Sequence, residues 1–228
     1  MSGKSYLLAT SKPWVLHAFA AHRPALPGEW SVVRTQAELQ SALSTSSPRY
    51  IFFPHWSEHI PEDLTDRVEC VCFHMTDLPY GRGGSPLQNL IIRGHKDTML
   101  SALRMTQEVD AGPIYAKRRL SLEGTAGEIF SRAAPIVCEM IGWIAMNEPE
   151  PQPQAGTPTR FKRRKPDESA LASQLDAVEI YDHIRMLDAP GYPKAFVEHG
   201  DWRLEFDRAQ LVGDEVEARV LFKRRDET

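Results

Sequence analysis

The stretch YIFFPHWSEHIPEDLTDRVECVCFH, residues 50–74, contains two short apolar runs that decide the fold. Residues 50–53 and 68–73 are rich in aromatic and branched side chains, which predicts two buried strands. On the N-terminal side of this stretch, residues 6–9 and 30–33 predict two more strands. Helical segments lie between them, one beginning at Pro13 and one after the capping box of Thr35 and Glu38. Strands that alternate with helices are typical of βαβ units, so we predict an α/β fold with a mostly parallel sheet.

Composition restricts the class of protein. The 228 residues are 42% hydrophobic and carry a net charge of −4, which excludes wholesale disorder and argues against a general nucleic-acid binder. No apolar run reaches about 18 residues, so no membrane span is expected. The N-terminal segment lacks the unbroken apolar stretch of a secretory signal. Three cysteines make an odd number, which favours a reducing, cytoplasmic setting over a disulfide framework.

The second half of the chain predicts a further, smaller unit. Residues 100–105 and 114–122 are expected to be strands, and a capping box at Thr125 and Glu128 begins a long amphipathic helix that contains Pro135. The proline-rich residues 148–158 have the composition of an extended linker. Beyond it we expect a helix, a hairpin and an amphipathic strand. The predicted domains are residues 1–150, a linker over 151–166, and a small helix-plus-antiparallel-sheet unit over 167–228.

His74 and Asp110 are the strongest candidates for chemistry. His74 follows a predicted strand and precedes a loop rich in glycine and proline, where an imidazole can face a cleft and act near neutral pH. Asp110 lies on a turn after another predicted strand. If the two strands are neighbours, the carboxylate can orient the imidazole and stabilise its cationic form. The alternative is a structural histidine and an aspartate that only forms a turn before Gly112.

Other constellations carry weaker signals. His55, Glu58 and His59 match an inverted zinc-peptidase pattern, but that motif needs a helix and the stretch is enclosed by Pro54 and Pro61. Cys70 and Cys72 share one face of a predicted strand and lack further metal ligands, so buried apolar thiols are the better interpretation.

Basic residues suggest two further sites. Arg82 either binds an anionic group of a substrate or braces its own loop. The run over residues 160–165, RFKRRK, is either a solvated charged face or a source of arginine contacts to phosphate.

Residues 70–117 resemble the formyltransferases that use 10-formyltetrahydrofolate, a family that includes methionyl-tRNA formyltransferases and nucleotide-sugar N-formyltransferases. The family pattern Asn-x-His-x-Ser-Leu-Leu-Pro-x-x-Arg-Gly corresponds here to CFHMTDLPYGRG, residues 72–83. Its later landmarks follow without a gap, at Pro86, Gly94, Thr98, Met105, Asp110 and Gly112. The resemblance implies a Rossmann-like catalytic domain over residues 1–150.

The same resemblance implies roles for individual residues. His74 and Asp110 fall on the catalytic histidine and aspartate, whereas Cys72 replaces a catalytic asparagine whose amide would stabilise the developing oxyanion by about 3 kcal/mol. A thiol is a weaker donor than an amide. The positions that correspond to folate contacts are Phe53, Trp56, Ser57, Val109 and Asp110. Those that would bind the acceptor are Arg82, Arg163 and Arg164.

The implied activity is transfer of a formyl group from 10-formyltetrahydrofolate to a primary amine, without a metal. A nucleotide-linked amino sugar for surface glycan synthesis is the favoured acceptor, because the stretch from Asp167 onward lacks the basic excess expected of a tRNA-binding unit. We therefore expect no nucleic-acid partner and no membrane, and homodimerisation is an option. Alternatives are an amino acid, peptide or tRNA-linked amine as acceptor, an inactive folate-binding homologue, and a zinc hydrolase.

Overall fold

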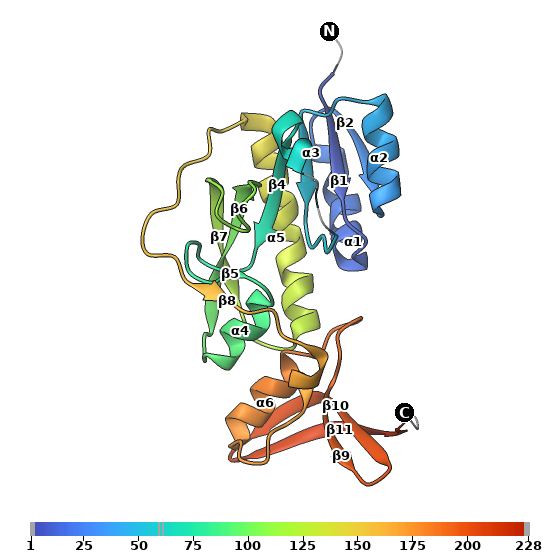
Figure 1. Cartoon of the computed structure of the whole chain (residues 1–228), viewed down its shortest axis with the longest axis vertical. Coiled ribbons are helices and arrows are strands. Elements are labelled where there is room, and N and C mark those ends of the chain that lie inside the picture. Colours follow the sequence, from blue (N-terminus) through green and yellow to red (C-terminus); the bar gives the residue numbers. More distant parts are fainter. Residues whose placement is uncertain (1–2, 59, 61, 226–228) are drawn as a thin grey trace. The chain divides into compact units, whose positions relative to one another are not determined.

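A computed structural model describes residues 3–58, 60 and 62–225 of the chain (Figure 1). The chain forms two compact units. The first comprises Met1–Gly83, Thr98–Leu120 and Ser131–Arg160, and the second comprises Gly84–Asp97, Ser121–Phe130 and Phe161–Thr228.

The first unit is built on a six-stranded sheet with the strand order β2-β1-β3-β4-β6-β7. The first four strands in this order pair in parallel, and β4 pairs with β6 antiparallel. The predicted mostly parallel sheet is therefore confirmed. The strands are β1 (Ser5–Ala9), β2 (Glu29–Val33), β3 (Tyr50–Phe53), β4 (Glu69–His74), β6 (Asp97–Arg104) and β7 (Ile114–Ser121).

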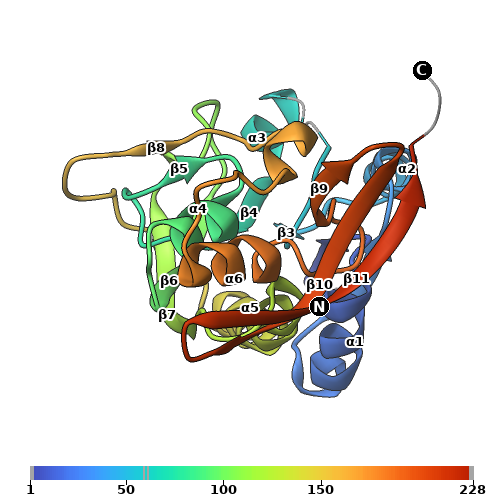
Figure 2. The same ribbon diagram turned by 90° about the horizontal axis from the view of Figure 1, so that it is seen from below.

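Helices cover both faces of this sheet (Figure 2). On one face α2 (Gln36–Thr45) and α3 (Glu62–Arg67) contribute Leu39 and Leu64 to a core that also contains Ile51 and Phe53. On the other face lie α1 (Pro13–His22), followed by η1 (Arg23–Ala25), and the part of α5 (Ala126–Asn147) that belongs to this unit. Burial on both faces explains why the central strands are apolar throughout.

Local signals in the sequence set where the helices begin. Pro13 is the first residue of α1, and Thr35 Oγ1 accepts a hydrogen bond from Glu38 N at the start of α2. Thr125 and Glu128 form the predicted capping box, and α5 continues through Pro135. By length and composition α5 could cross a membrane, but 61% of its most apolar 18-residue window is buried, as in a core helix.

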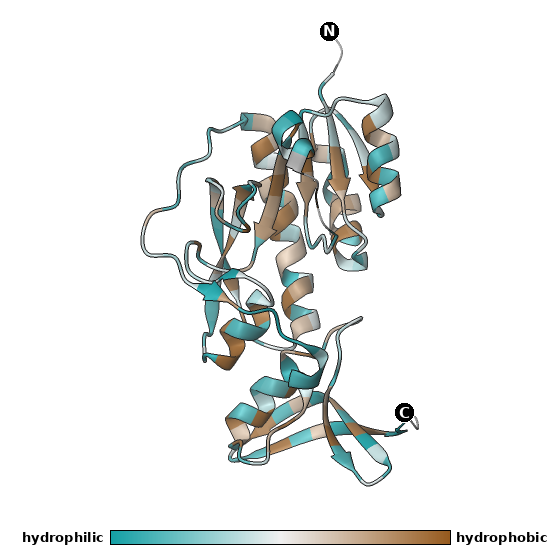
Figure 3. Ribbon diagram, viewed as in Figure 1, coloured by the Kyte–Doolittle hydropathy of each residue, from teal (hydrophilic) through white to brown (hydrophobic). Residues whose placement is uncertain are grey.

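The second unit contains a three-stranded antiparallel sheet with the order β11-β10-β9. The predicted hairpin joins β9 to β10, and the predicted helix is α6, which Asp176 caps. Hydrophilic and hydrophobic residues mix along β10 and β11 (Figure 3). The apolar alternation of β11 is present, but Val220 and Phe222 are 40% and 58% exposed. The elements are α4 (Pro86–Ile92), η2 (Pro166–Ser169), α6 (Ala177–Arg185), β9 (Ala195–His199), β10 (Trp202–Val212) and β11 (Glu215–Arg224).

The division into units does not follow chain order. Residues 84–97 and 121–130 group with the C-terminal residues, whereas the predicted domains were contiguous. Hydrogen bonds give the physical reason: Leu122 N donates to Lys96 O, and the buried guanidinium of Arg185 donates to Leu122 O and Gly124 O. The predicted domain limits, residues 1–150, 151–166 and 167–228, stay a prediction.

Candidate active site

His74 is the last residue of β4 and is 7% exposed. The chain that follows β4 is fixed by β6: Ser101 Oγ donates to Thr76 O at 2.8 Å, and Thr98 Oγ1 donates to Met75 O at 3.4 Å. Both β6 side chains are buried. The main chain after His74 therefore has a defined course before the loop rich in glycine and proline begins.

The imidazole of His74 contacts the chain through both ring nitrogens. Nε2 lies 2.8 Å from Gly81 O, and because a carbonyl oxygen can only accept, Nε2 carries the hydrogen. Nδ1 lies 3.4 Å from Asp110 Oδ2, so the predicted pairing of the two residues is present. A neutral ring then has its lone pair on Nδ1. If Nδ1 gains a proton, the Asp110 carboxylate is placed to stabilise the cation.

Asp110 reaches His74 from a loop that folds back along the sheet. Because β6 is antiparallel to β4, residue 104 pairs with Val71 near the beginning of β4, and the chain must return from there. Asp110 has φ 55°, and its Oδ2 accepts a hydrogen bond from Gly83 N at 2.9 Å. Gly112 allows this return, since a Cβ there would lie 1.8 Å from Arg104 O.

A cavity of about 240 Å³ lies against Asp110. Cys72 and Asp110 both contribute to its wall. The other lining residues come from two segments, the first with Glu58, Ile60 and Thr65, and the second with Leu103, Arg104, Met105, Thr106, Gln107, Val109 and Gly112. Burial raises the pKa of the Cys72 thiol, and nearby Asp110 raises it further. Cys72 therefore keeps its proton at neutral pH and is not a thiolate nucleophile.

The residues assigned to folate contact differ in where they lie. Val109 is 62% exposed and lines the cavity together with Asp110. Phe53 is 2% exposed and lies in the core. Its ring packs edge-on against that of half-buried Trp56, with the ring centroids 5.9 Å apart. The indole Nε1 of Trp56 is buried without a hydrogen-bond partner among the described residues, and Ser57 is exposed. The structure thus brings two of the five together at the cavity, and the contacts themselves stay a prediction.

Arg82 is held by side chains of its own unit. Its Nε and Nη2 donate to Gln154 Oε1 at 3.1 and 2.8 Å, and its Nη1 lies 3.5 Å from Glu108 Oε1. This arrangement favours the bracing role over acceptor binding. Arg82 begins the short strand β5 (Arg82–Gly83), which pairs with β8 (Arg160–Phe161).

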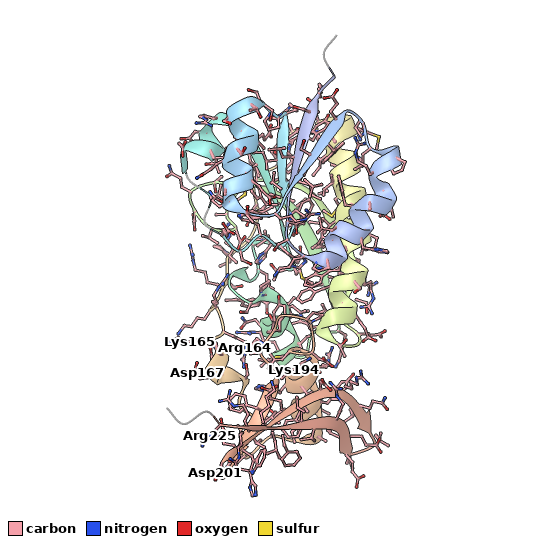
Figure 4. All side chains as sticks on the ribbon, turned by 90° about the vertical axis from the view of Figure 1, so that its right-hand side faces the viewer. Arg164, Lys165, Asp167, Lys194, Asp201 and Arg225 are labelled. Carbon is pink, nitrogen blue, oxygen red and sulfur yellow. The ribbon has the colours of Figure 1, made fainter. Side chains whose placement is uncertain are left out.

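Arg163 and Arg164 belong to the second unit. Figure 4 shows Arg164 and Lys165 on the segment that leads into η2. Arg163 is exposed, whereas Arg164 is half-buried, and its guanidinium donates to Glu168 O. Burial lowers the pKa of Arg164. Of the two, Arg163 has the side chain available to a ligand in solution.

The described residues of the zinc pattern do not form the helix that the motif requires. The described residues between Pro54 and Glu58 form a turn and extended chain, and His59 lies outside the described residues. Within the described part of the chain, no three His, Cys, Asp or Glu side chains gather as a metal site. Cys70 is buried and Cys72 is half-buried, both as free thiols against the same apolar core.

Two functional candidates escaped sequence reasoning. Gln154 Nε2 donates to Asp110 O and to Gly112 O, both at 2.8 Å, and Thr159 Oγ1 accepts from Gly81 N at 2.7 Å. Both residues lie in or just beyond the stretch assigned to a linker by composition. The glutamines there alternate with prolines, and nothing in that pattern distinguishes a solvated amide from one that binds a loop.

Sequence comparison finds a matching family model and curated relatives. A family model for the C-terminal domain of methionyl-tRNA formyltransferase matches residues 166–223. The methionyl-tRNA formyltransferase of Sinorhizobium medicae is 29% identical over 167 residues, which is 69% of this chain and 52% of that protein. The chain spans about half the length of the curated relatives that it matches.

Structural comparison extends the match over nearly the whole chain. The methionyl-tRNA formyltransferase from Clostridium thermocellum is 42% identical with a TM-score of 0.93, covering 97% of this chain and 100% of that one. HypX from Aquifex aeolicus, solved in complex with tetrahydrofolic acid, is 16% identical with a TM-score of 0.75. It covers 92% of this chain and 38% of that one, and this likeness shows the fold alone.

Proposed function

The chain belongs to the formyltransferase family, and from this premise we propose that it transfers a formyl group from 10-formyltetrahydrofolate to a primary amine. The observation that carries the proposal is the His74–Asp110 pair, 3.4 Å apart, beside a cavity that Asp110 itself lines.

His74 supplies acid–base chemistry in this proposal. Its Nε2 hydrogen is committed to Gly81 O, so Nδ1 is the nitrogen that accepts a proton from the amine as that amine attacks. The Asp110 carboxylate stabilises the resulting imidazolium, and Gly83 N keeps the carboxylate in place. Nδ1 can then return the proton to the departing nitrogen, so that no proton needs to come from solvent.

Cys72 occupies the position where the family resemblance has an asparagine. Its protonated thiol faces the cavity and is a weak donor to a developing oxyanion. The proposal therefore assigns oxyanion stabilisation chiefly to the imidazolium of His74 and to nearby main-chain N–H groups. We therefore expect a lower turnover than an asparagine at position 72 would give.

The cavity has features that fit a pterin ring. Leu103, Met105 and Val109 supply apolar surface, and the loop over residues 105–112 offers main-chain groups that can hydrogen-bond a flat heterocycle. The volume of about 240 Å³ is below the roughly 300–1,000 Å³ of a site for a whole drug-sized ligand. The bound folate would supply the activated one-carbon unit, with only its ring system inside the cavity.

For the acceptor we favour an amine on a nucleotide-linked sugar. Residues 167–228 contain 8 Lys and Arg but 15 Asp and Glu, so this part of the chain repels a polyphosphate backbone. The basic run over residues 160–165 is left as the phosphate-binding element. A short cluster of this kind suits the two phosphates of a nucleoside diphosphate better than a tRNA stem.

An aminoacyl-tRNA is the second candidate acceptor. The support for it is that the curated relatives, the matching family model and the Clostridium thermocellum protein all carry the name methionyl-tRNA formyltransferase. The family model covers residues 166–223, which is most of the chain beyond the basic run.

A panel of acceptors tests the proposal. The protein is incubated with 10-formyltetrahydrofolate and, in separate reactions, nucleotide-linked amino sugars, methionyl-tRNA, and free amino acids or peptides. Products are identified by the mass gain of one formyl group, with the His74→Ala variant as the control in every reaction. We expect product with a sugar nucleotide and none with methionyl-tRNA.

Each other outcome has a definite meaning. Product with methionyl-tRNA alone overturns the sugar acceptor but keeps the reaction. No product with any amine, together with tight folate binding, overturns the enzymatic proposal in favour of an inactive folate-binding homologue. Product from the His74→Ala variant at the wild-type rate removes His74 from the mechanism.

A further inference from the structure

The segment between α5 and β8 ties together the two loops that carry the site. We call residues 152–160 the strap. At one end, Gln152 exchanges both main-chain hydrogen bonds with Ile114, the first residue of β7, with N-to-O distances of 2.8 and 2.7 Å. At the other end, Thr159 N donates to Pro79 O at 3.1 Å, and Arg82 N donates to Thr159 O at 3.0 Å. The strap therefore bridges the β6–β7 loop and the loop after β4.

Gln154 is the strap residue whose side chain turns inward. It is half-buried, while the strap residues on either side of it are exposed. Its Nε2 donates to Asp110 O and Gly112 O, and its Oε1 accepts from Arg82. A primary amide offers two N–H donors and an acceptor in one neutral group. Gln154 uses all three functions, two on the Asp110 loop and one on the loop after β4.

Asp110 has a conformation that needs such support. A residue other than glycine at φ 55° is strained by about 1–2 kcal/mol and persists only where its surroundings hold it. Gln154 fixes the carbonyl of Asp110 itself and that of Gly112, two residues later. The strap thus holds the main chain from which the Asp110 carboxylate extends toward His74, while Gly83 N holds the carboxylate itself.

The strap also reaches His74 by a second path. Thr159 Oγ1 accepts from Gly81 N at 2.7 Å, and Gly81 O accepts from His74 Nε2 at 2.8 Å. Each member of the pair is therefore linked to the strap, Asp110 directly through its carbonyl and His74 through one intervening residue.

We propose that Gln154 is a positioning residue that holds the Asp110 carboxylate against His74 Nδ1. The proposal rests on the function proposed above. Gln154 acts through Asp110, because its amide bonds the Asp110 main chain and the Arg82 side chain and is not itself part of the proton transfer.

Kinetics of matched strap variants test this role. Gln152→Ala is the control, since Gln152 is exposed and its Nε2 donates to Glu150 O, two residues away, at 3.2 Å. We expect Gln154→Ala to lower kcat about 10-fold with KM for the acceptor within about 2-fold. A misplaced Asp110 carboxylate would stabilise the transition state less well but would leave the contacts that bind the acceptor in place. Gln154→Glu keeps the acceptor for Arg82 but sets a carboxylate against two carbonyl oxygens. It should be at least as harmful as Gln154→Ala.

A double-mutant cycle distinguishes action through Asp110 from general damage. In an Asp110→Ala background, the added Gln154→Ala substitution should change the residual kcat by less than about 2-fold. Two independent, multiplicative losses would overturn the proposal. Thermal unfolding of each variant accompanies the kinetics, and a kcat loss that only follows a lowered Tm would overturn it as well.

One readout does not require turnover. With nitrogen-15-labelled histidine, the ring nitrogens of His74 report whether the carboxylate still faces Nδ1. We expect Gln154→Ala to move the Nδ1 resonance and Gln152→Ala to leave it in place; an unmoved resonance in Gln154→Ala overturns the proposal. If the wild-type protein formylates no amine but the resonance moves as expected, the proposed function fails and the positioning role stands.

Discussion

The two ends of β4 carry polar groups that are built in opposite ways. At the beginning of the strand, Glu69 accepts hydrogen bonds on both oxygens, from Tyr115 Oη and, at 2.6 Å, from Arg49 Nη1. The remaining nitrogens of Arg49 donate to Glu148 Oε2 at 3.2 Å and Tyr50 Oη at 2.9 Å. At the end of the strand, His74 Nδ1 lies 3.4 Å from Asp110 Oδ2, longer than an ordinary hydrogen bond.

The difference shows that paired polar side chains can either stabilise the fold or remain available for a reaction. In the amino-end cluster (Arg49, Tyr50, Glu69, Tyr115 and Glu148) each polar side chain has at least one hydrogen-bond partner within the cluster. Burial and then the hydrogen bond to Glu69 raise the pKa of Tyr115, so its hydrogen bond persists over the working pH range. At the other end a neutral His74 has a nitrogen that can still take a proton, beside a strained aspartate and a cavity. Stability is expected from the first end and turnover from the second.

The largest expected effect is the loss of turnover in His74→Ala. Removing the proposed proton acceptor should lower kcat by about 100-fold or more. Asp110→Ala should act in the same direction. Both are measured by formyl transfer to the acceptor found in the panel. The comparison fails if Glu69→Gln, at the opposite end of β4, lowers kcat as much as His74→Ala does.

Gly112→Ala should disturb the site through the loop that carries Asp110. A Cβ at this buried position would lie 1.8 Å from Arg104 O, so the loop must shift. We expect kcat to fall about 10–100-fold, as for misplaced catalytic groups, and unfolding free energy to fall by about 1–3 kcal/mol. Activity assays and urea unfolding measure the two effects. A wild-type kcat in Gly112→Ala would show that the position of Asp110 does not depend on the conformation of this loop.

Cys72→Asn should raise turnover, because an amide is a better donor than a thiol to the developing negative oxygen. Up to about 10-fold is expected, less than the full contribution of about 10²–10³ for an oxyanion donor that the site was built around. Cys72→Ala is the matched variant and should lie within about 3-fold of wild type. A larger loss in Cys72→Ala than in His74→Ala would assign the chemistry to the thiol.

Glu69→Gln should weaken folding and leave kcat within about 2-fold, if the amino-end cluster is structural. The substitution removes the charge that Arg49 and Tyr115 share, which should cost about 1–3 kcal/mol of unfolding free energy. Urea denaturation measures it, with Glu29→Gln as an exposed control. An unchanged midpoint would contradict the assignment of stability to this end of β4.

The smallest expected effect concerns Glu148 and acid. Hydrogen bonds from Lys4 and then Arg49 lower the pKa of Glu148 below its ordinary 4.5. A carboxyl group with a lowered folded-state pKa stabilises the fold above its unfolded-state pKa, and that contribution is lost as pH falls through the folded value. Glu148→Gln should therefore reduce stability at neutral pH, and its difference from wild type should shrink below pH of about 4. A constant difference across this range would contradict it.

Sequence patterns predicted the elements well because the interactions that set them are local. The apolar runs of β1, β3 and β4, the proline that begins α1 and the boxes that cap α2 and α5 each depend on residues within a few positions. His74 and Asp110 were also identified from their places at a strand end and a turn. The apolar alternation of β11 was found as well, but not the exposure of Val220 and Phe222, which depends on what packs against that face.

Patterns along the sequence identify the strands β1 to β4, the helices α1, α2 and α5 with their starting residues, and the two residues most suited to acid–base chemistry. Tertiary structure decided that β6 runs antiparallel to β4, so that Asp110 reaches His74 by a loop that folds back. It also decided that Gln154 bonds Asp110, 44 residues away, and Arg82, 72 residues away. Strand direction and such distant contacts follow from how the whole chain packs, and periodicity along the sequence contains no information about either.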